Sequence, residues 1–87
     1  MDQQRLDKFR EQLDLHHAWP SVFTFKFIVP VGKEIPLKEL FPNHTPNVKT
    51  SENGNYTSFT YQMMMPSSQA VIDIYITAAK IEGLIAL

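Results

Sequence analysis

The sequence predicts an α+β domain in which a four-stranded antiparallel sheet has helices packed on one face. Two stretches, residues 21–29 and 56–64, alternate polar and apolar side chains as half-buried strands do. Two others, residues 3–16 and 67–81, repeat apolar residues at spacings of three and four, the period of an amphipathic helix. A short helical segment and two short strands complete the order, which is one helix followed by βαββαβ.

The first predicted helix carries its apolar residues on a narrow stripe made by Leu6, Phe9, Leu13 and His16. Acids and bases are mixed on its polar side, whereas a helix that lies on a membrane surface has a mainly basic polar face. The pattern therefore favours a helix that lies on the domain or on a symmetry mate.

Pro20 separates this helix from the first strand, because the residue before a proline avoids the α conformation. Trp19 is either an anchor for a ligand or a hydrophobic residue that fixes the passage from helix to strand. In the strand itself, side chains alternate between an apolar face and a mixed one. The apolar face holds Phe23, Phe25, Phe27 and Val29, and the mixed face holds Val22, Thr24, Lys26 and Ile28.

The segment "IPLKELFP", residues 35–42, predicts a helix of one or two turns, since Pro36 suits a first helical position and Pro42 prevents continuation. Asn53-Gly54 then predicts a hairpin with a two-residue type I′ turn, in which both central residues have positive φ. The resulting register puts Val48, Lys49 and Ser51 opposite Phe59, Ser58 and Tyr56.

Ser67 is a good N-cap for the last helix, which we expect to continue to about Ile81 and to end before Gly83. The closing "LIAL", residues 84–87, is long enough for an edge strand. This order is that of the ferredoxin-like sandwich, with strands in the spatial order 4-1-3-2. We therefore predict one ferredoxin-like domain over residues 1–87, with a helix appended at residues 1–17 and a short first crossover helix.

Composition and charge disfavour several classes of protein. A formal net charge of -1 gives no positive field to collect nucleic-acid phosphates. The chain has no cysteine, and its start, "MDQQRLDKFREQ", lacks the apolar core of a signal peptide. We therefore expect a cytoplasmic protein that binds neither nucleic acid nor a membrane.

The sequence also lacks the motifs of common catalytic and metal sites. Its three glycines are far apart, which disfavours a phosphate loop, and no serine lies in a nucleophile elbow. The three histidines are His16, His17 and His44, and the first two, as neighbours, point away from each other and make poor co-ligands. We expect no catalytic residues, no cofactor and no metal.

The aromatic residues of the two central strands are either a platform for stacking bases, as in RNA-recognition domains of this topology, or a core. Turning the rings outward would put Thr24, Lys26 and Gln62 under the helices, where each unpaired polar group costs roughly 1 to 3 kcal/mol. Burying the rings instead stabilises the fold by about 2 kcal/mol apiece. We therefore predict that the rings form the core.

The opposite face of the sheet then stays open, and it is the candidate interaction surface. Three interpretations of it remain: a subunit interface, a site for an anion or another small molecule, or a solvated surface. The candidate residues offer ammonium, hydroxyl and amide groups with no acid among them, and they are Thr24, Lys26, Lys49, Ser51, Tyr56, Ser58, Thr60 and Gln62.

Three segments of the chain, "WPSVFTFKFIVP", "VKTSENGNYTSFT" and "IDIYITAAKIEGLIAL", carry a resemblance to a known family. Over residues 19–30 and 48–87 the chain resembles the YbeD-like family of small bacterial proteins, a domain of unknown function. The match is most specific in the pattern S-x-x-G-N-Y-x-S, at residues 51–58. Residues 31–47 are shorter than in the family and the N-terminal helix is longer, so we expect that helix to fill the vacated space on the sheet.

The resemblance implies a ferredoxin-like fold similar to the ACT-like regulatory domain of phosphoglycerate dehydrogenase, and it brings no catalytic residues. We therefore predict a non-enzymatic regulatory or protein-interaction module that acts through the open sheet face, as a homodimer or on a partner protein. The alternative is an ACT-like sensor that binds a small anionic metabolite on Lys26, Lys49 and the neighbouring hydroxyls.

Overall fold

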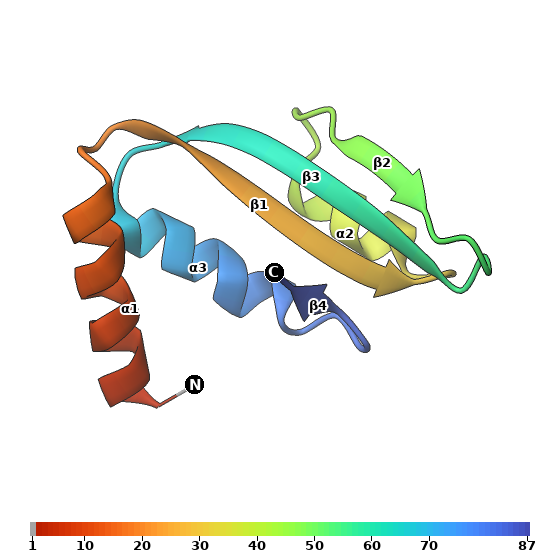
Figure 1. Cartoon of the computed structure of the whole chain (residues 1–87), viewed down its shortest axis with the longest axis horizontal. Coiled ribbons are helices and arrows are strands. Elements are labelled where there is room, and N and C mark those ends of the chain that lie inside the picture. The colour runs from red at the N-terminus through yellow and green to blue at the C-terminus, as the bar shows by residue number, and fades with distance from the viewer. Residues whose placement is uncertain (1) are drawn as a thin grey trace.

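The computed structural model describes residues 2–87 and has three helices and four strands in the predicted order (Figure 1). Residue 1 of the predicted domain and appended helix lies outside the described residues. The helices are α1 (Gln3–His16), α2 (Glu34–Leu40) and α3 (Ser68–Ala78). The strands are β1 (Ser21–Pro30), β2 (Asn47–Thr50), β3 (Tyr56–Met65) and β4 (Ile85–Ala86).

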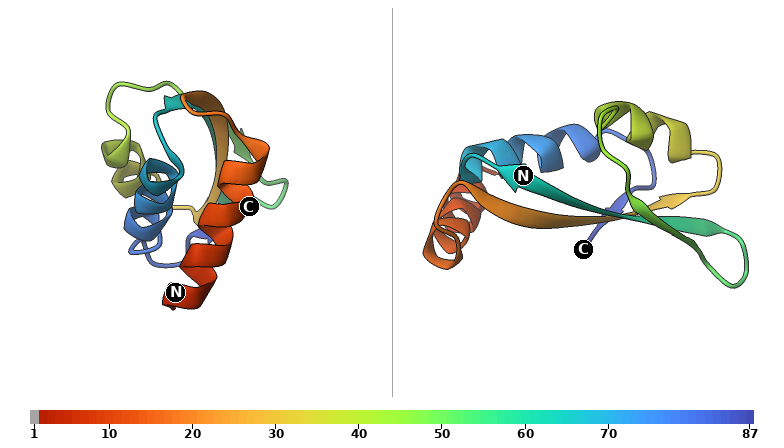
Figure 2. Two further views of the ribbon diagram at one scale, coloured as in Figure 1. Left: turned by 90° about the vertical axis from the view of Figure 1, so that its left-hand side faces the viewer. Right: turned by 90° about the horizontal axis from the view of Figure 1, so that it is seen from above.

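The sheet is antiparallel throughout, with the strand order β2-β3-β1-β4. Read from the β4 edge, this is the predicted order 4-1-3-2. β1 and β3 pair along their ten residues and form its centre. α2 and α3 lie together on one face, α1 lies at the end of the sheet, and the other face is uncovered within residues 2–87 (Figure 2). The fold is thus an α+β sandwich with one open sheet face.

The hairpin between β2 and β3 has the predicted register but not the predicted turn. The only residues of positive φ within the described chain are glycines, so Asn53 does not take the conformation that a type I′ turn needs. Instead the Gly54 N–H donates to the Ser51 carbonyl at 2.9 Å, and the Ser51 N–H donates to the Tyr56 carbonyl at 2.8 Å. The Asn53 Oδ1 accepts from the Ser51 hydroxyl at 2.9 Å, which holds the side chain inside a longer loop.

The alternation along β1 and β3 sends every second side chain beneath the helices, as predicted. Phe25, Phe27 and Phe59 are 0 % exposed and Tyr61 is 1 % exposed, whereas Phe23 is only partly buried. The base-stacking interpretation is therefore wrong for the buried rings. The rest of the core comes from all three helices, the connecting segments and the ends of the strands: Leu13, Val29, Leu37, Phe41, Met63, Met65, Val71, Ile72 and Ala78.

α1 packs against α3, whereas α2 lies toward the other end of the sheet (Figure 1). The buried residue of α1 is Leu13, and the ring of Phe9 in α1 lies 5.7 Å from the ring of Tyr75 in α3. The expectation that α1 fills the space left by a short crossover helix is therefore wrong. The narrow apolar stripe of α1 meets the side of α3 instead.

Aromatic contacts hold the connection between α1 and β1. Trp19 stacks on His17 with ring centroids 5.0 Å apart, and its indole N–H donates to the Asp14 carboxylate at 2.9 Å. The His17 ring also lies 5.4 Å from that of Phe23. Of the two interpretations of Trp19, these contacts favour the structural one.

The two crossover helices differ slightly from the prediction. α2 is as short as expected but begins at Glu34, which puts Pro36 in its third position rather than its first. α3 has the predicted cap, in which the Ser67 hydroxyl accepts from the Ala70 N–H at 3.1 Å. It ends at Ala78, before the expected end near residue 81, because turns take the chain to the two-residue strand β4.

We expect Tyr61→Phe to raise the free energy of unfolding. The Tyr61 hydroxyl is the one buried side-chain polar atom of residues 2–87 that has no hydrogen-bond partner, so folding strips it of water without compensation. Removing it should stabilise the fold by about 1 kcal/mol, measured by urea denaturation. Tyr56→Phe, at an exposed ring, is the control and should change stability by less than about 0.5 kcal/mol. A loss of stability in Tyr61→Phe would contradict the unpaired state of the hydroxyl.

We expect Gly83→Ala to destabilise the protein more than Gly32→Ala. Both glycines have positive φ, 81° and 103°, so both substitutions carry a similar backbone strain of about 1 to 2 kcal/mol. A Cβ at Gly83 would also lie 2.7 Å from Cγ of Pro30, whereas at Gly32 it would meet nothing within 4 Å. Thermal melts of the two variants measure the difference, and equal losses would show that no close approach exists at the end of β1.

Candidate functional site

The eight predicted residues lie on the side of the sheet away from α2 and α3, and we call this surface the open face (Figure 2). Their positions follow from the register, in which Thr24 lies opposite Gln62 and Lys49 opposite Ser58, all alternating with the buried rings. The exposed members are Thr24, Lys26, Lys49, Tyr56 and Gln62, and the partly buried members are Ser51, Ser58 and Thr60.

Two hollows in the surface gather most of the eight residues. The larger, of about 490 Å³, is lined by Ile28, Lys49, Thr50, Ser51, Glu52, Tyr56, Ser58 and Ile85. The second, of about 410 Å³, is lined by Thr45, Pro46, Asn47, Thr60 and Gln62. Thr24 and Lys26 line neither hollow. The structure therefore brings together four of the predicted residues in one hollow and two in another.

The hydroxyls of the larger hollow already have partners in the protein. The Ser51 hydroxyl donates to Asn53 and accepts from the Tyr56 N–H at 3.1 Å. The Ser58 hydroxyl donates to the Lys49 carbonyl at 3.3 Å. Since each hydroxyl has a single proton, neither serine can donate to an anion without giving up one of these bonds.

The two lysines of the open face are without ion-pair partners in the described chain. The salt bridge found in residues 2–87 joins Arg10 and Asp7 at 2.8 Å. β3 separates Lys26 from Lys49, which puts their strands roughly 10 Å apart. Glu52, which the sequence analysis did not place here, lines the same hollow as Lys49 and makes its charge mixed.

Sequence analysis overlooked part of the apolar character of this face. The exposed fractions are 64 % for Met64, 54 % for Val22, 49 % for Ile85 and 43 % for Tyr56. Val22 lies opposite Met64, and Ile28 lies opposite Ile85, so each pair forms a small apolar patch across two strands. Met64 could have been found from the alternation along β3. Ile85 could not, because its face depends on the register of a two-residue strand.

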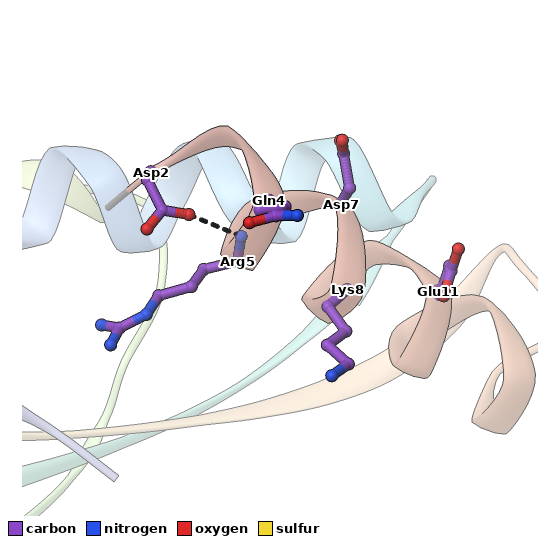
Figure 3. Close-up of a pocket in the computed structure, with 6 residues that line it drawn as sticks. All are labelled: Asp2, Gln4, Arg5, Asp7, Lys8 and Glu11. Atoms are coloured by element: carbon purple, nitrogen blue, oxygen red, sulfur yellow. Dashed lines mark hydrogen bonds between the residues drawn. The ribbon is translucent and has the colours of Figure 1, made fainter.

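A separate hollow of about 520 Å³ lies on the outer side of α1. Figure 3 shows that the polar side chains lining it spread away from the helix rather than converge. They are Asp2, Gln4, Arg5, Asp7, Lys8 and Glu11. The Asp2 carboxylate there accepts from the Arg5 N–H at 2.8 Å, which is an N-cap contact. Hydrogen bonds from Gln3 and then Arg10 hold the pKa of Asp7 below its usual range. This surface caps and solvates the helix, and we assign it no chemistry.

Within residues 2–87, no group of three or more His, Asp and Glu residues is placed to hold a metal ion. None of the helices described is long and apolar enough to cross a membrane. Comparison of the chain with protein-family models, with curated proteins and with solved structures finds no match.

One carboxylate ties the loop before α2 to the sheet. Glu34 accepts from the Gly32 N–H at 2.6 Å and from the Thr57 hydroxyl at 3.2 Å. Hydrogen bonds from its own N–H and from the Gly32 N–H lower the pKa of Glu34, and Thr57 and Lys38 contribute less. The ionised carboxylate is therefore the form that the fold favours.

We expect Glu34→Gln to reduce the loss of stability in acid. Because the folded pKa of Glu34 lies below the unfolded value, its contribution is present above the unfolded pKa and is lost as pH falls through the folded pKa. The melting temperature of wild type should therefore be higher than that of Glu34→Gln at neutral pH, and the two should converge on acidification. Glu39→Gln, an exposed carboxyl on the same helix, is the control. A constant difference at every pH would contradict the role of the charge.

Proposed function

We propose that this protein is a non-enzymatic regulatory or protein-interaction module that binds through the open face. We further propose that its fold is ferredoxin-like, that it is related to the YbeD-like family with its ACT-like similarity, and that it acts in the cytoplasm of bacteria, as the sequence predicts. The strand order and the helices on a single face support the fold assignment.

The observation that carries the functional proposal is the uncovered sheet face with large apolar side chains among polar ones. Met64, Val22 and Ile85 expose about half or more of their surface there. Exposed apolar patches bordered by polar residues are typical of protein-binding surfaces, and tyrosine is enriched in them. The unpaired Lys26 and Lys49 favour a partner that offers apolar and acidic groups together, either a second copy or another protein.

A small-molecule sensor is the second candidate, because the hollow around Lys49 has the size of small-molecule sites. Glu52 and the engaged hydroxyls of Ser51 and Ser58 weigh against an anion at this place. A thermal-shift screen with anionic metabolites separates the two functions, since a ligand at a hundred times its dissociation constant stabilises the fold by about 2.7 kcal/mol. A metabolite whose shift disappears in Lys49→Glu would replace the interaction proposal.

We expect charge reversal on the open face to weaken self-association about tenfold, because the introduced acids would replace lysines that can pair with Glu52 of the other copy and would repel it. The variant is Lys26→Glu with Lys49→Glu, and Met64→Glu tests the apolar part of the same face. Lys80→Glu, an exposed lysine after α3, is the control. Sedimentation over a range of concentrations gives the association constants. A monomer at every concentration in wild type would exclude the second copy and leave a different protein as the partner.

A further inference from the structure

The outer edge of β1 is only partly covered by another strand. β4 pairs with Phe27 and Ile28, and the Leu87 N–H donates to the Lys26 carbonyl at 2.9 Å. Among residues 2–87, no strand lies beside the segment before Lys26 on this side (Figure 1). Since backbone groups alternate in direction along an antiparallel strand, Thr24 and Val22 direct their N–H and C=O outward as Lys26 does. Thr24 is exposed, and its backbone groups have no backbone partner on that side in residues 2–87.

An apolar groove of about 580 Å³ lies between α1, α3 and the β4 segment, and we call it the edge groove. Its walls come from α1, from α3 and the residue after it, and from the β4 segment: Arg5, Phe9, Tyr75, Ala79, Leu84, Ala86 and Leu87. Its position next to β1 follows from two contacts. The Tyr75 ring lies 5.3 Å from that of Phe25, and Ala86 is the strand partner of Phe27. The outer edge of β2 is also free, but there all four residues of the strand are exposed, and the hollow beside Lys49 and Thr50 belongs to the open face.

Arg5 adds an unpaired positive charge to the edge groove. Its guanidinium makes no ion pair and no hydrogen bond in the described chain, whereas that of Arg10 binds both Asp7 and Gln69. Figure 3 shows the Arg5 side chain extending away from Asp7 and Glu11, while Asp2 lies at the same end of the helix as Arg5. The groove therefore combines an apolar lining with one cation that lacks a counter-charge.

From this edge, groove and charge, we propose that the edge groove binds an extended, acidic and apolar segment of a partner protein as an added antiparallel strand next to β1. The segment continues the line of β4, and its residue opposite Thr24 exchanges main-chain hydrogen bonds with Thr24. The residues on either side of that one turn toward the helices, so their side chains enter the groove against Phe9 and Tyr75. An acidic residue of the segment pairs with Arg5.

A single extended chain fits this place better than a second copy of the protein. α1 and β4 stand on either side of the free segment, since both line the same groove. A second β1 would bring its own α1 and β4 into that space, whereas an isolated peptide brings only its side chains. The inference is separate from the proposed function, because the edge groove lies on the helix side of the sheet.

The test uses the full chain and a phage-displayed library of random peptides of about eight residues. We expect selected peptides to alternate apolar residues and to carry an acid. Thr24→Pro removes the outward N–H, and because that group does not bond to β3, the strand should tolerate it. Loss of this bond should weaken a selected peptide about tenfold. Val48→Pro makes the same change at the free edge of β2 and should leave affinity unchanged.

Three further variants and one direct measurement keep the test independent of folding defects. Ala79→Phe fills the groove and should abolish binding, whereas Lys80→Phe, one residue further on, should not. Arg5→Glu should weaken acidic peptides at least several-fold. Hydrogen exchange should show the Thr24 amide protected by the peptide and the Val48 amide unaffected.

The inference would be overturned if the selected peptides bind Thr24→Pro and Ala79→Phe as tightly as wild type. It would also be overturned if the library yields no more binding peptides with wild type than with the Thr24→Pro protein. Binding lost in Lys49→Glu and Met64→Glu instead would overturn it while supporting the open face as the docking surface. A wild-type dimer that Thr24→Pro converts to monomers would assign the edge to a second copy.

Discussion

Burial of the aromatic side chains of β1 and β3 is the constraint on which the rest of the structure depends. Phe25, Phe27, Phe59 and Tyr61 are removed from water together, each contributing about 2 kcal/mol. Since side chains alternate with a period of two, this decides the side of every other residue on both strands. A slip of one residue would expose the rings and put Lys26 under α3. The composition of the open face is thus a consequence of the core.

The small size of the domain explains why two surfaces remain uncovered. Two of the three helices of this 87-residue chain cover one face of the sheet, and the outer strands are much shorter than the central ones. Within residues 2–87, β4 pairs with two residues of β1 and no strand pairs with Thr24 on that side, while α1 packs on α3. The open face and the edge groove both arise where the central ribbon of β1 and β3 extends beyond the elements that cover it.

Features set by local periodicity could be predicted from the sequence, and features set by tertiary contacts could not. The bounds of α1 and the side of each open-face residue followed from spacing, and the register of β2 with β3 followed from the position of Asn53-Gly54. The turn at Asn53 depends on a side-chain hydrogen bond, and the position of α1 depends on the side of α3 that it meets. The hydrogen bonds that the hydroxyls of Ser51 and Ser58 donate within the protein could not be predicted without coordinates. The edge groove joins residues from both ends of the chain, which no local pattern relates.

Under the two proposals, β1 connects the open face with the edge groove. Thr24 and Lys26 present their side chains to the open face and their outward backbone groups to the edge, because the two directions alternate together along a strand. A peptide residue paired with Thr24 would place its own side chain on the open face beside the Thr24 side chain. Occupation of the edge therefore changes the area and charge that the open face offers. If both proposals hold, strand geometry couples binding at the two surfaces without any movement of the helices.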